Sequence, residues 1–425
     1  MIGRTKQRIL SSAWLKNTLF LTLSTILVQL ITVAISPILS RLYSPEDFGL
    51  LGKLTAYTSI FAVISTLKFD MAIMLSTSPK ETKFLINCSE FLIIAISLIA
   101  IPIYAMLYSN GDPFILFIVF LLIFLNGNLS LFTNIHSRYK NFKGLALASV
   151  ANRLSSAIYQ ITFGFFLNNV FSLIIGQLIG LLTYFSYLNK KSKYSILKVI
   201  RFDLKNFKDA KPVLKKHYRF PLYTAPQVFL NSLSQNIPLL LMDSFFGSSV
   251  IGFYWFSMRI ISMPIGAVAS SFRQTFYQKA SLINSNQELL KLYIKSTKLL
   301  FLIGLPFVIL GFIFSPFIFS LVFGDEWKEA GLYTRWLLPW LFFGLINPPS
   351  SVLINVLNLQ KFNLMYDVTL FLFRFTSIFL GGTYLGALET IKIFSGVGVL
   401  FNIFYISFVY YYLKNQIRYN HYRNP

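Results

Sequence analysis

The stretch that decides how this chain is organised is "NKKSKYSILKVIRFDLKNFKDAKPVLKKHYR", from Asn189 to Arg219, which holds eleven basic residues and two acids. On both sides of it, long apolar runs dominate the sequence. A helix needs about 20 apolar residues to cross the hydrocarbon core of a bilayer, and such runs recur from residue 17 to residue 413. We predict six of them before the basic stretch and six after it.

The composition places the chain among polytopic membrane proteins. Of its 425 residues, 55% are hydrophobic and only 12% are charged, and the mean hydropathy is +0.63. Hydropathy predicts an all-α fold with about twelve spans, at residues 17–39, 50–67, 84–108, 113–133, 145–165, 169–188, 220–241, 250–272, 297–322, 333–355, 363–385 and 390–413. We therefore expect three parts: a six-helix bundle over 1–188, a basic cytoplasmic linker over 189–219 and a second six-helix bundle over 220–425.

The net charge of +23 follows the predicted topology. With the N-terminus placed in the cytoplasm, the inner segments carry a large excess of Lys and Arg over acids, whereas the outer segments carry more acids than bases. This is the distribution that orients multi-pass proteins. We expect both termini to be cytoplasmic and the basic stretch to lie on anionic lipid headgroups. No nucleic-acid partner is expected, because no folded binding module can be recognised.

The division into six and six is typical of transporters built from two related halves with the same orientation. One trace of such a repeat is the pair "LYSPEDFGLLGK" (Leu42–Lys53) and "FFGSSVIGFYWF" (Phe245–Phe256). Each places a turn before a helix that opens near a glycine, Gly49 in the first half and Gly252 in the second. The external connections are short, so we expect no external domain.

Ionisable side chains at bilayer depth are costly, and each is a candidate functional residue. The predicted spans contain Lys53, Glu90, Arg153, Arg259, Asp367 and Arg374. At about 1.5 Å rise per residue the three arginines lie near the midplane, and Arg153 and Arg374 have nearly the same depth in the two halves. Three arginines without a matching number of acids in the spans indicate an anionic ligand, because arginine binds phosphate or carboxylate bidentately. We predict that the three arginines and Lys53 are cations of a substrate cavity, although any one arginine could instead bond backbone carbonyls, pair with an acid or snorkel.

Polar residues provide two further candidate groups. Gln227, Asn231 and Gln235 recur every four residues and predict an amide stripe on one helix face, which could bind sugar hydroxyls or hold helices together. Glu90 and Asp367 are the embedded acids that could carry a proton or coordinate sodium.

Other functional classes find little support. The sequence has no nucleophile elbow, phosphate-binding glycine loop or paired carboxylate motif, so we expect neither enzyme activity nor a cofactor. Cys88 is the only cysteine, which excludes an internal disulfide and a thiolate metal site. His136, His217 and His421 are expected to be solvated loop residues, and no metal site is expected.

Two segments resemble the bacterial polysaccharide biosynthesis proteins of the Wzx type. Tyr218–Ser281 contains an aromatic-Pro pair, a Phe-Phe-Gly turn, and an arginine followed by a proline in the eighth span. These are Phe220 and Pro221, Phe245–Gly247, Gly252 with Tyr254, and Arg259 with Pro264. Leu39–Ser76 resembles the N-terminal signature of the family, including a basic-x-acidic-x-Ala pattern from Lys68 onward. Together the segments cover about a quarter of the chain.

The resemblance implies a flippase of the multidrug, oligosaccharidyl-lipid and polysaccharide (MOP) exporter superfamily, with a MATE-like fold of two six-helix bundles around a central cationic cavity. Such a protein would carry an undecaprenyl-diphosphate-linked oligosaccharide repeat unit, for O-antigen of lipopolysaccharide or for capsule, from the inner to the outer leaflet of the bacterial inner membrane by alternating access. Its partners would be this substrate, membrane lipids and other polysaccharide-assembly proteins.

Two alternatives stay open at this point. The first is a cation-coupled exporter of drugs or other small molecules from the same superfamily, which should favour acids in its cavity. The second is a membrane glycan polymerase or ligase, which generally places its acceptor chemistry in a large external loop.

Overall fold

The structure, a computed structural model, describes residues 2–108, 111–192, 207–283, 285–357 and 359–423, and all regular elements in these ranges are helical. The first half contains α1 (Ile2–Leu42), α2 (Pro45–Ile64), α3 (Phe69–Ala72), η1 (Ile73–Leu75), α4 (Pro79–Tyr108), α5 (Pro113–Arg138), α6 (Phe142–Gly164), α7 (Val170–Lys191), α9 (Phe207–His217) and η3 (Phe220–Thr224). The second half contains α10 (Ala225–Phe246), α11 (Ser248–Ala280), α12 (Asn286–Phe323), η4 (Asp325–Trp327), α13 (Lys328–Ile346), α14 (Pro348–Val356), α15 (Gln360–Tyr384) and α16 (Ala387–Arg423).

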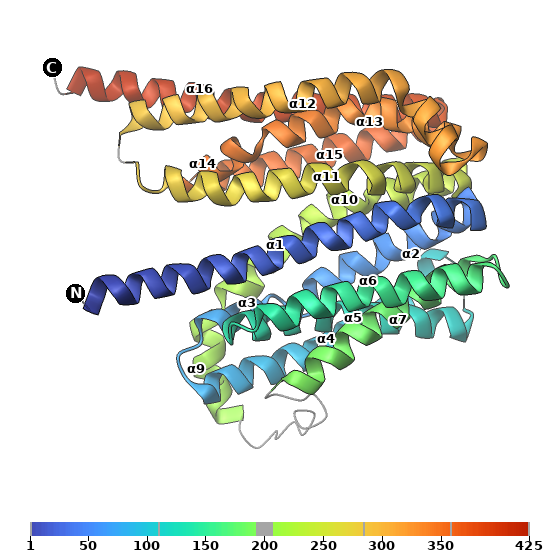
Figure 1. The fold of residues 1–425 in the computed structure, drawn as a ribbon, viewed down its shortest axis with the longest axis horizontal. Coiled ribbons are helices and arrows are strands. Elements are labelled where there is room, and N and C mark those ends of the chain that lie inside the picture. The colour runs from blue at the N-terminus through green and yellow to red at the C-terminus, as the bar shows by residue number, and fades with distance from the viewer. Residues whose placement is uncertain (1, 109–110, 193–206, 284, 358, 424–425) are drawn as a thin grey trace. The chain divides into compact units, whose positions relative to one another are not determined.

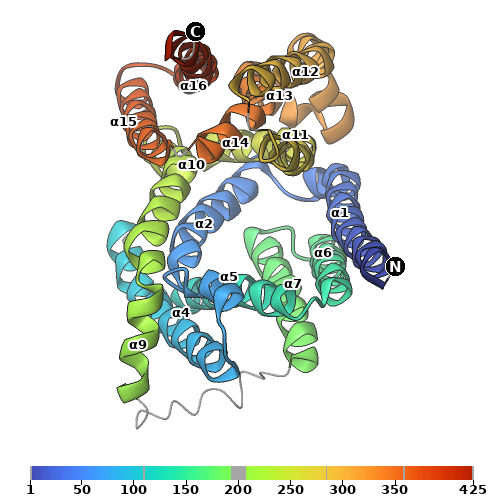
Figure 2. The same ribbon diagram turned by 90° about the vertical axis from the view of Figure 1, so that its left-hand side faces the viewer.

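The chain packs as two compact units. Unit 1 comprises Met1–Tyr43 and Lys53–Asn236, and unit 2 comprises Ser44–Gly52 and Ile237–Pro425. Within each unit the long helices run side by side (Figures 1 and 2). The first turns of α2 therefore pack with unit 2, and α10 begins in unit 1 and ends in unit 2.

All twelve predicted spans fall on helices, which confirms the all-α membrane fold. In the described part of the chain, ten helical segments are long and apolar enough to cross a membrane. The other two predicted spans correspond to α6 and α10, which have the length but are more polar, because α6 contains Arg153 and α10 contains the amide stripe. The span predicted over 333–355 is interrupted at Asn347, where the consecutive prolines Pro348 and Pro349 begin α14. Proline suits the first turn of a helix, because the N–H that it lacks would have no partner there.

The outer surfaces of the helices carry large apolar side chains. Met106 on α4 is 84% exposed, and Phe307, Phe317 and Leu321 on α12 are 65–73% exposed. A soluble monomer rarely exposes such continuous apolar surface, whereas lipid solvates it. The chain is a multi-pass membrane protein.

A short irregular segment connects α2 to α4 in unit 1. This segment, residues 66–77, contains α3 and η1 and is called the elbow below. Its α3 begins after Leu67 and Lys68, whose backbone φ angles are 45° and 62°. The apolar side chains of the elbow, led by Phe69 and Ile73, join α4, α5 and α7 in one buried core of unit 1.

In unit 2 the first turns of α2 and α11 touch through their backbones at two glycines. A Cβ atom on Gly49 would overlap the carbonyl of Ser248, and one on Gly252 would overlap the carbonyl of Pro45. Beside this contact the Phe48 ring packs edge-on against Trp327, with 5.2 Å between ring centroids. The glycines that mark the repeat in the sequence are therefore required by close packing.

Replacing Gly252 by alanine should lower the stability of the protein by about 1–3 kcal/mol, because the added methyl group overpacks a backbone contact. Gly266→Ala is the matched control, since it lies on the same helix α11 and a Cβ there meets nothing within 4 Å. Thermal unfolding of the two variants in detergent measures the difference. Equal melting temperatures would contradict the close contact.

Candidate functional site

A cavity of about 340 Å³ lies inside unit 1, among α1, α5, α6 and α7. Its lining consists of Leu21, Val28, Leu129, Thr133, Ser137, Leu145, Ser149, Asn152, Arg153 and Tyr184. This lining includes one cation, several hydroxyl and amide groups, and no acidic side chain. The cavity is therefore amphipathic and positively charged.

Helical spacing brings these side chains together. Leu129, Thr133 and Ser137 recur every four residues and so lie on one face of α5. The Thr133 hydroxyl and the Tyr184 hydroxyl of α7 are 2.8 Å apart and share a hydrogen bond. Polar groups therefore line the cavity on the α5 and α7 sides as well as on α6.

Arg153 is the charged group of the cavity. Its Nε and Nη2 atoms are buried, and neither has a hydrogen-bond partner among the described residues. These two nitrogens form the edge of the guanidinium whose parallel N–H groups fit two oxygens of one phosphate or carboxylate group. Burying such donors without an acceptor costs several kcal/mol, so this edge favours an oxyanion as its partner.

The structure places the other predicted cations against aromatic rings. The Lys53 ammonium lies 4.1 Å from the centroid of the Tyr108 ring in unit 1. In unit 2 the Arg259 guanidinium lies 5.0 Å from the Trp255 ring. None of these residues lines the cavity of unit 1. Of the site residues predicted from the sequence, only Arg153 lines this cavity.

Arg374, the counterpart of Arg153 in the second half, has a different environment. It is only 5% exposed, and its guanidinium lies 4.7 Å from the Trp340 ring and 5.3 Å from the Phe394 ring. Cation–π contacts of this kind contribute about 2 kcal/mol or more when water is excluded. The aromatic rings of unit 2 therefore stabilise the Arg374 charge.

The two embedded acids also differ. Glu90 on α4 is 4% exposed, and its carboxyl oxygens have no hydrogen-bond partner among the described residues. Asp367 on α15 accepts a hydrogen bond of 3.0 Å from the Asn363 side-chain amide. The Oδ1 atom of the same amide accepts a hydrogen bond of 2.6 Å from the Tyr405 hydroxyl.

The amide residues of α10 form the predicted stripe. Gln227, Asn231 and Gln235 are all exposed, and the Gln235 amide donates a 2.7 Å hydrogen bond to the Asn231 side chain. Among the described residues no group of three His, Cys, Asp or Glu side chains could hold a metal ion.

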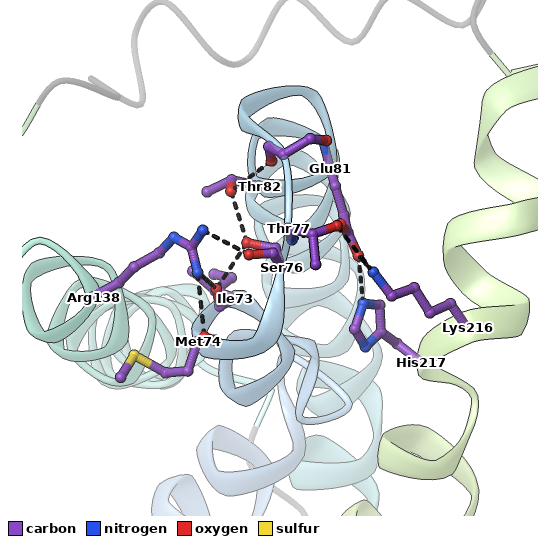
Figure 3. Close-up of polar contacts among 10 residues, drawn as sticks. Ile73, Met74, Ser76, Thr77, Glu81, Thr82, Arg138, Lys216 and His217 are labelled. Atoms are coloured by element: carbon purple, nitrogen blue, oxygen red, sulfur yellow. Dashed lines mark hydrogen bonds and ion pairs between the residues drawn. The ribbon is translucent and has the colours of Figure 1, made fainter.

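Sequence reasoning missed a polar network around the elbow. Asp70, which is 1% exposed, accepts hydrogen bonds from Thr66 within the elbow and from Ser130 and Asn134 of α5, at 2.7–2.9 Å. Arg138, at the end of α5, donates to the carbonyls of Ile73, Met74 and Ser76 at 2.7–3.2 Å (Figure 3). Helix α5 therefore holds the elbow at two charged residues, Asp70 of the elbow and Arg138 of α5.

On its other side the elbow is connected to α9 through Glu81 (Figure 3). One Glu81 oxygen accepts hydrogen bonds from Lys216 at 2.8 Å and His217 at 2.7 Å, and the other accepts two from Thr77 at 2.8 Å. Glu81 and His217 are 7% and 5% exposed. We call this group of Thr77, Glu81, Lys216 and His217 the clasp.

The expectation that the histidines are solvated loop residues is wrong for two of them. His217 is buried in the clasp, and His136 is 3% exposed within α5, where its ring meets the carbonyl of Leu188 at 3.2 Å. His421 lies beyond the residues whose side chains the structure describes. Both buried histidines are held because a polar partner from another helix satisfies the ring.

One sequence signal could have located the clasp. Ser78 and Glu81 have the Ser-x-x-Glu spacing of a capping box, and the Ser78 hydroxyl accepts the Glu81 backbone N–H at 3.2 Å. The Glu81 side chain reaches back to the backbone N–H of Thr77. No comparable pattern in the sequence identifies its partners on α9.

Removing Arg153 and removing Arg138 should have opposite effects on the stability of the ligand-free protein. Arg153→Met should leave the melting temperature unchanged or raise it, because it removes buried donors that have no acceptor in the described part of the chain. Arg138→Met should lower the stability by roughly 1–3 kcal/mol, because it leaves main-chain carbonyls unsatisfied. A marked destabilisation by Arg153→Met, measured by thermal unfolding in detergent, would mean that this arginine has a structural role.

Comparisons with known proteins agree with this architecture. A family model described as "Polysaccharide biosynthesis protein" matches residues 38–331. The capsular polysaccharide biosynthesis protein CapF of Staphylococcus aureus is 25% identical over 417 residues, which cover 94% of this chain and 99% of CapF. This agrees with the resemblance found in the sequence.

Solved transporter structures share the fold. The lipid II flippase MurJ in an inward closed conformation has a TM-score of 0.70 and 16% identity, with 92% of this chain and 87% of that chain covered. An inward-facing multidrug resistance transporter of the MATE family has a TM-score of 0.61 and 16% identity, with coverage of 91% and 98%. The fold is thus that of MOP superfamily transporters, and the match over residues 38–331 shows that the chain belongs to the polysaccharide biosynthesis protein family.

Proposed function

We propose that this protein is a flippase that moves an undecaprenyl-diphosphate-linked oligosaccharide repeat unit, for capsule or O-antigen, across the bacterial inner membrane. The headgroup passes from the inner to the outer leaflet by alternating access, while the polyprenyl tail stays in lipid. In this proposal both termini lie in the cytoplasm, which the distribution of basic residues in the sequence supports. Membership of the polysaccharide biosynthesis family and a fold shared with a lipid II flippase support this proposal.

The observation that carries the proposal is the cavity with the Arg153 guanidinium in its wall. The Arg153 guanidinium has buried donors without a partner among the described residues, and such a charge is costly in a membrane protein unless a ligand supplies the acceptor. The phosphates of a diphosphate-linked sugar supply oxyanions, to which the Ser137 hydroxyl can donate. The Thr133 and Ser149 hydroxyls donate to the backbone carbonyls of Leu129 and Leu145 and can accept hydrogen bonds from sugar hydroxyls. The volume of about 340 Å³ is at the small end of ligand pockets. It suits a phosphate with one sugar better than a whole repeat unit.

The remaining predicted residues have secondary roles in this proposal. Lys53, Arg259 and Arg374 add positive charge along the path of the headgroup, and Gln227, Asn231 and Gln235 provide amide contacts to sugar hydroxyls. Glu90, whose buried carboxyl has no described donor, and Asp367 are candidates for proton or sodium coupling.

A cation-coupled exporter of small molecules is the second candidate, because a multidrug transporter shares the fold. A cationic drug, however, requires an anionic cavity, and the lining described above contains an arginine and no acid. Growth inhibition by a panel of cationic drugs, with and without the gene, distinguishes the two functions.

In proteoliposomes, the wild-type protein should translocate a fluorescent undecaprenyl-diphosphate-linked oligosaccharide. Arg153→Gln should slow this transport by roughly tenfold or more, because a charge-assisted hydrogen bond contributes about 1.5–3 kcal/mol. Arg153→Lys, which keeps the charge but loses the bidentate geometry, should give an intermediate rate. Loss of fluorescence on addition of an impermeant quencher measures the fraction translocated.

Arg335→Gln is the matched control for the charge change. Arg335 donates to the carbonyls of Phe312 and Ile313 in unit 2 and has no role in the proposed cavity, so this variant should transport at the wild-type rate. A wild-type protein that does not move the substrate rules out the flippase. Unchanged transport by the combined glutamine variant of Arg153, Arg259 and Arg374 rules out the role of these arginines.

A further inference from the structure

We propose that the elbow transmits occupancy of the cavity to helix α9, the last helix before the chain turns into α10. The proposal rests on the proposed function, since it takes the cavity of unit 1 as a substrate site. Three features of unit 1 carry it: a helix with one stripe toward the cavity and one toward the elbow, a strained turn and the clasp.

Helix α5 connects the cavity to the elbow. Its residues 129, 133 and 137 line the cavity, while the residues one position later in each turn, Ser130, Asn134 and Arg138, bond the elbow. The two stripes therefore lie on adjacent faces of the same helical turns. A ligand that contacts Thr133 or Ser137 acts on the turns that hold Asp70 and the carbonyls of η1.

The elbow itself holds strained backbone. Leu67 and Lys68 have φ angles of 45° and 62°, a left-handed region that non-glycine side chains rarely adopt. Each such residue costs about 1–3 kcal/mol and persists only where the surroundings fix it. Here the fixing groups are those around Asp70: the Thr66 hydroxyl donates to Asp70 and accepts the Lys68 N–H. If these contacts weaken, the elbow can relax to a second arrangement.

The clasp passes such a change to α9. Thr77 ends the elbow and bonds Glu81, and Glu81 holds Lys216 and His217 at the end of α9. Val213 and Leu214 of α9 and Phe220 of η3 pack against the same buried core as Phe69 and Ile73 of the elbow. Polar and apolar contacts thus join the elbow to α9 over its last two turns.

Helix α9 lies shortly before α10 in the chain, so a movement of α9 affects α10. Seven residues, 218–224, separate α9 from α10, and they include η3 with Pro221 in its first turn. Helix α10 continues from unit 1 into unit 2. A displacement of α9 therefore acts directly on the helix that joins the two units. In an alternating-access cycle, binding of the headgroup in unit 1 would thereby affect the position of α10, which continues into unit 2.

Hydrogen–deuterium exchange of the purified full-length protein, followed by mass spectrometry, tests the coupling without any ligand. Arg138→Gln removes the arginine bonds from α5 to the elbow carbonyls and should accelerate exchange in the α9 peptide by roughly tenfold or more, as expected for the loss of a charge-assisted hydrogen bond. Glu81→Gln, which weakens the clasp directly, serves as the positive reference. Arg335→Gln, which disturbs a similar arginine–carbonyl contact in unit 2, should leave α9 unchanged.

The cavity end of the coupling needs its own variant. Ser149→Phe fills part of the cavity from α6. It should change the exchange rate of the α9 peptide by roughly threefold or more, because a small change in the free energy of local opening changes the exchange rate. The same substitution in the Arg138→Gln background should have no effect on α9. If Arg138→Gln unfolds the protein, Asn134→Ala replaces it, because it removes one neutral bond to Asp70 and should act in the same direction with smaller size.

Two results would overturn the proposal: acceleration confined to residues 66–77 in Arg138→Gln, or unchanged α9 exchange in Ser149→Phe. Neither result bears on transport, so the flippase proposal would stand if the exchange experiment failed. Conversely, an inactive wild-type protein in liposomes would remove the flippase while leaving a measured coupling between cavity and α9 in place.

Discussion

In a bilayer, a polar group inside a helix bundle has no water to bond, so the protein itself must satisfy every buried charge. The structure meets this constraint in different ways at different charges. Arg374 lies between aromatic rings, Arg138 bonds three main-chain carbonyls, and Asp70 accepts bonds from hydroxyl and amide groups. Two charged groups differ: the Glu90 carboxyl oxygens and the buried Nε and Nη2 atoms of Arg153 have no hydrogen-bond partner among the described residues. Of these two residues only Arg153 lines the cavity, and for this reason its cavity carries the functional proposal.

The architecture could be predicted from the sequence because the bilayer sets it directly. Each span must be long and apolar, so the twelve spans predicted from hydropathy all fall on helices in the described part of the chain. Two of these helices, α6 and α10, are more polar than the ten segments that are long and apolar enough to cross a membrane. The glycines of the repeat could also be recognised. These glycines are required because the backbones of the first turns of α2 and α11 are in contact. That contact depends on tertiary packing, which could not be predicted from the sequence.

The environment of each embedded charge could not be predicted. Arg153 and Arg374 have the same residue type and nearly the same depth, yet one lines a cavity and the other is enclosed by Trp340 and Phe394, because the side chains that surround them come from other helices. The same limit explains the error for His217. Its neighbours in sequence are basic and polar, but Glu81, which buries it, lies 136 residues away.

The two stripes of α5 are offset by a single residue, so their assignment to cavity and elbow depends on the rotation of this helix about its axis. One residue corresponds to about 100° of rotation at 3.6 residues per turn. Inserting one residue into α5 before Leu129 would therefore turn Ser130, Asn134 and Arg138 away from the elbow and bring other side chains into their place. In this helix a shift in register by one residue would carry the cavity stripe to the elbow and turn the elbow stripe away from both sites, so its length is constrained as strictly as its composition.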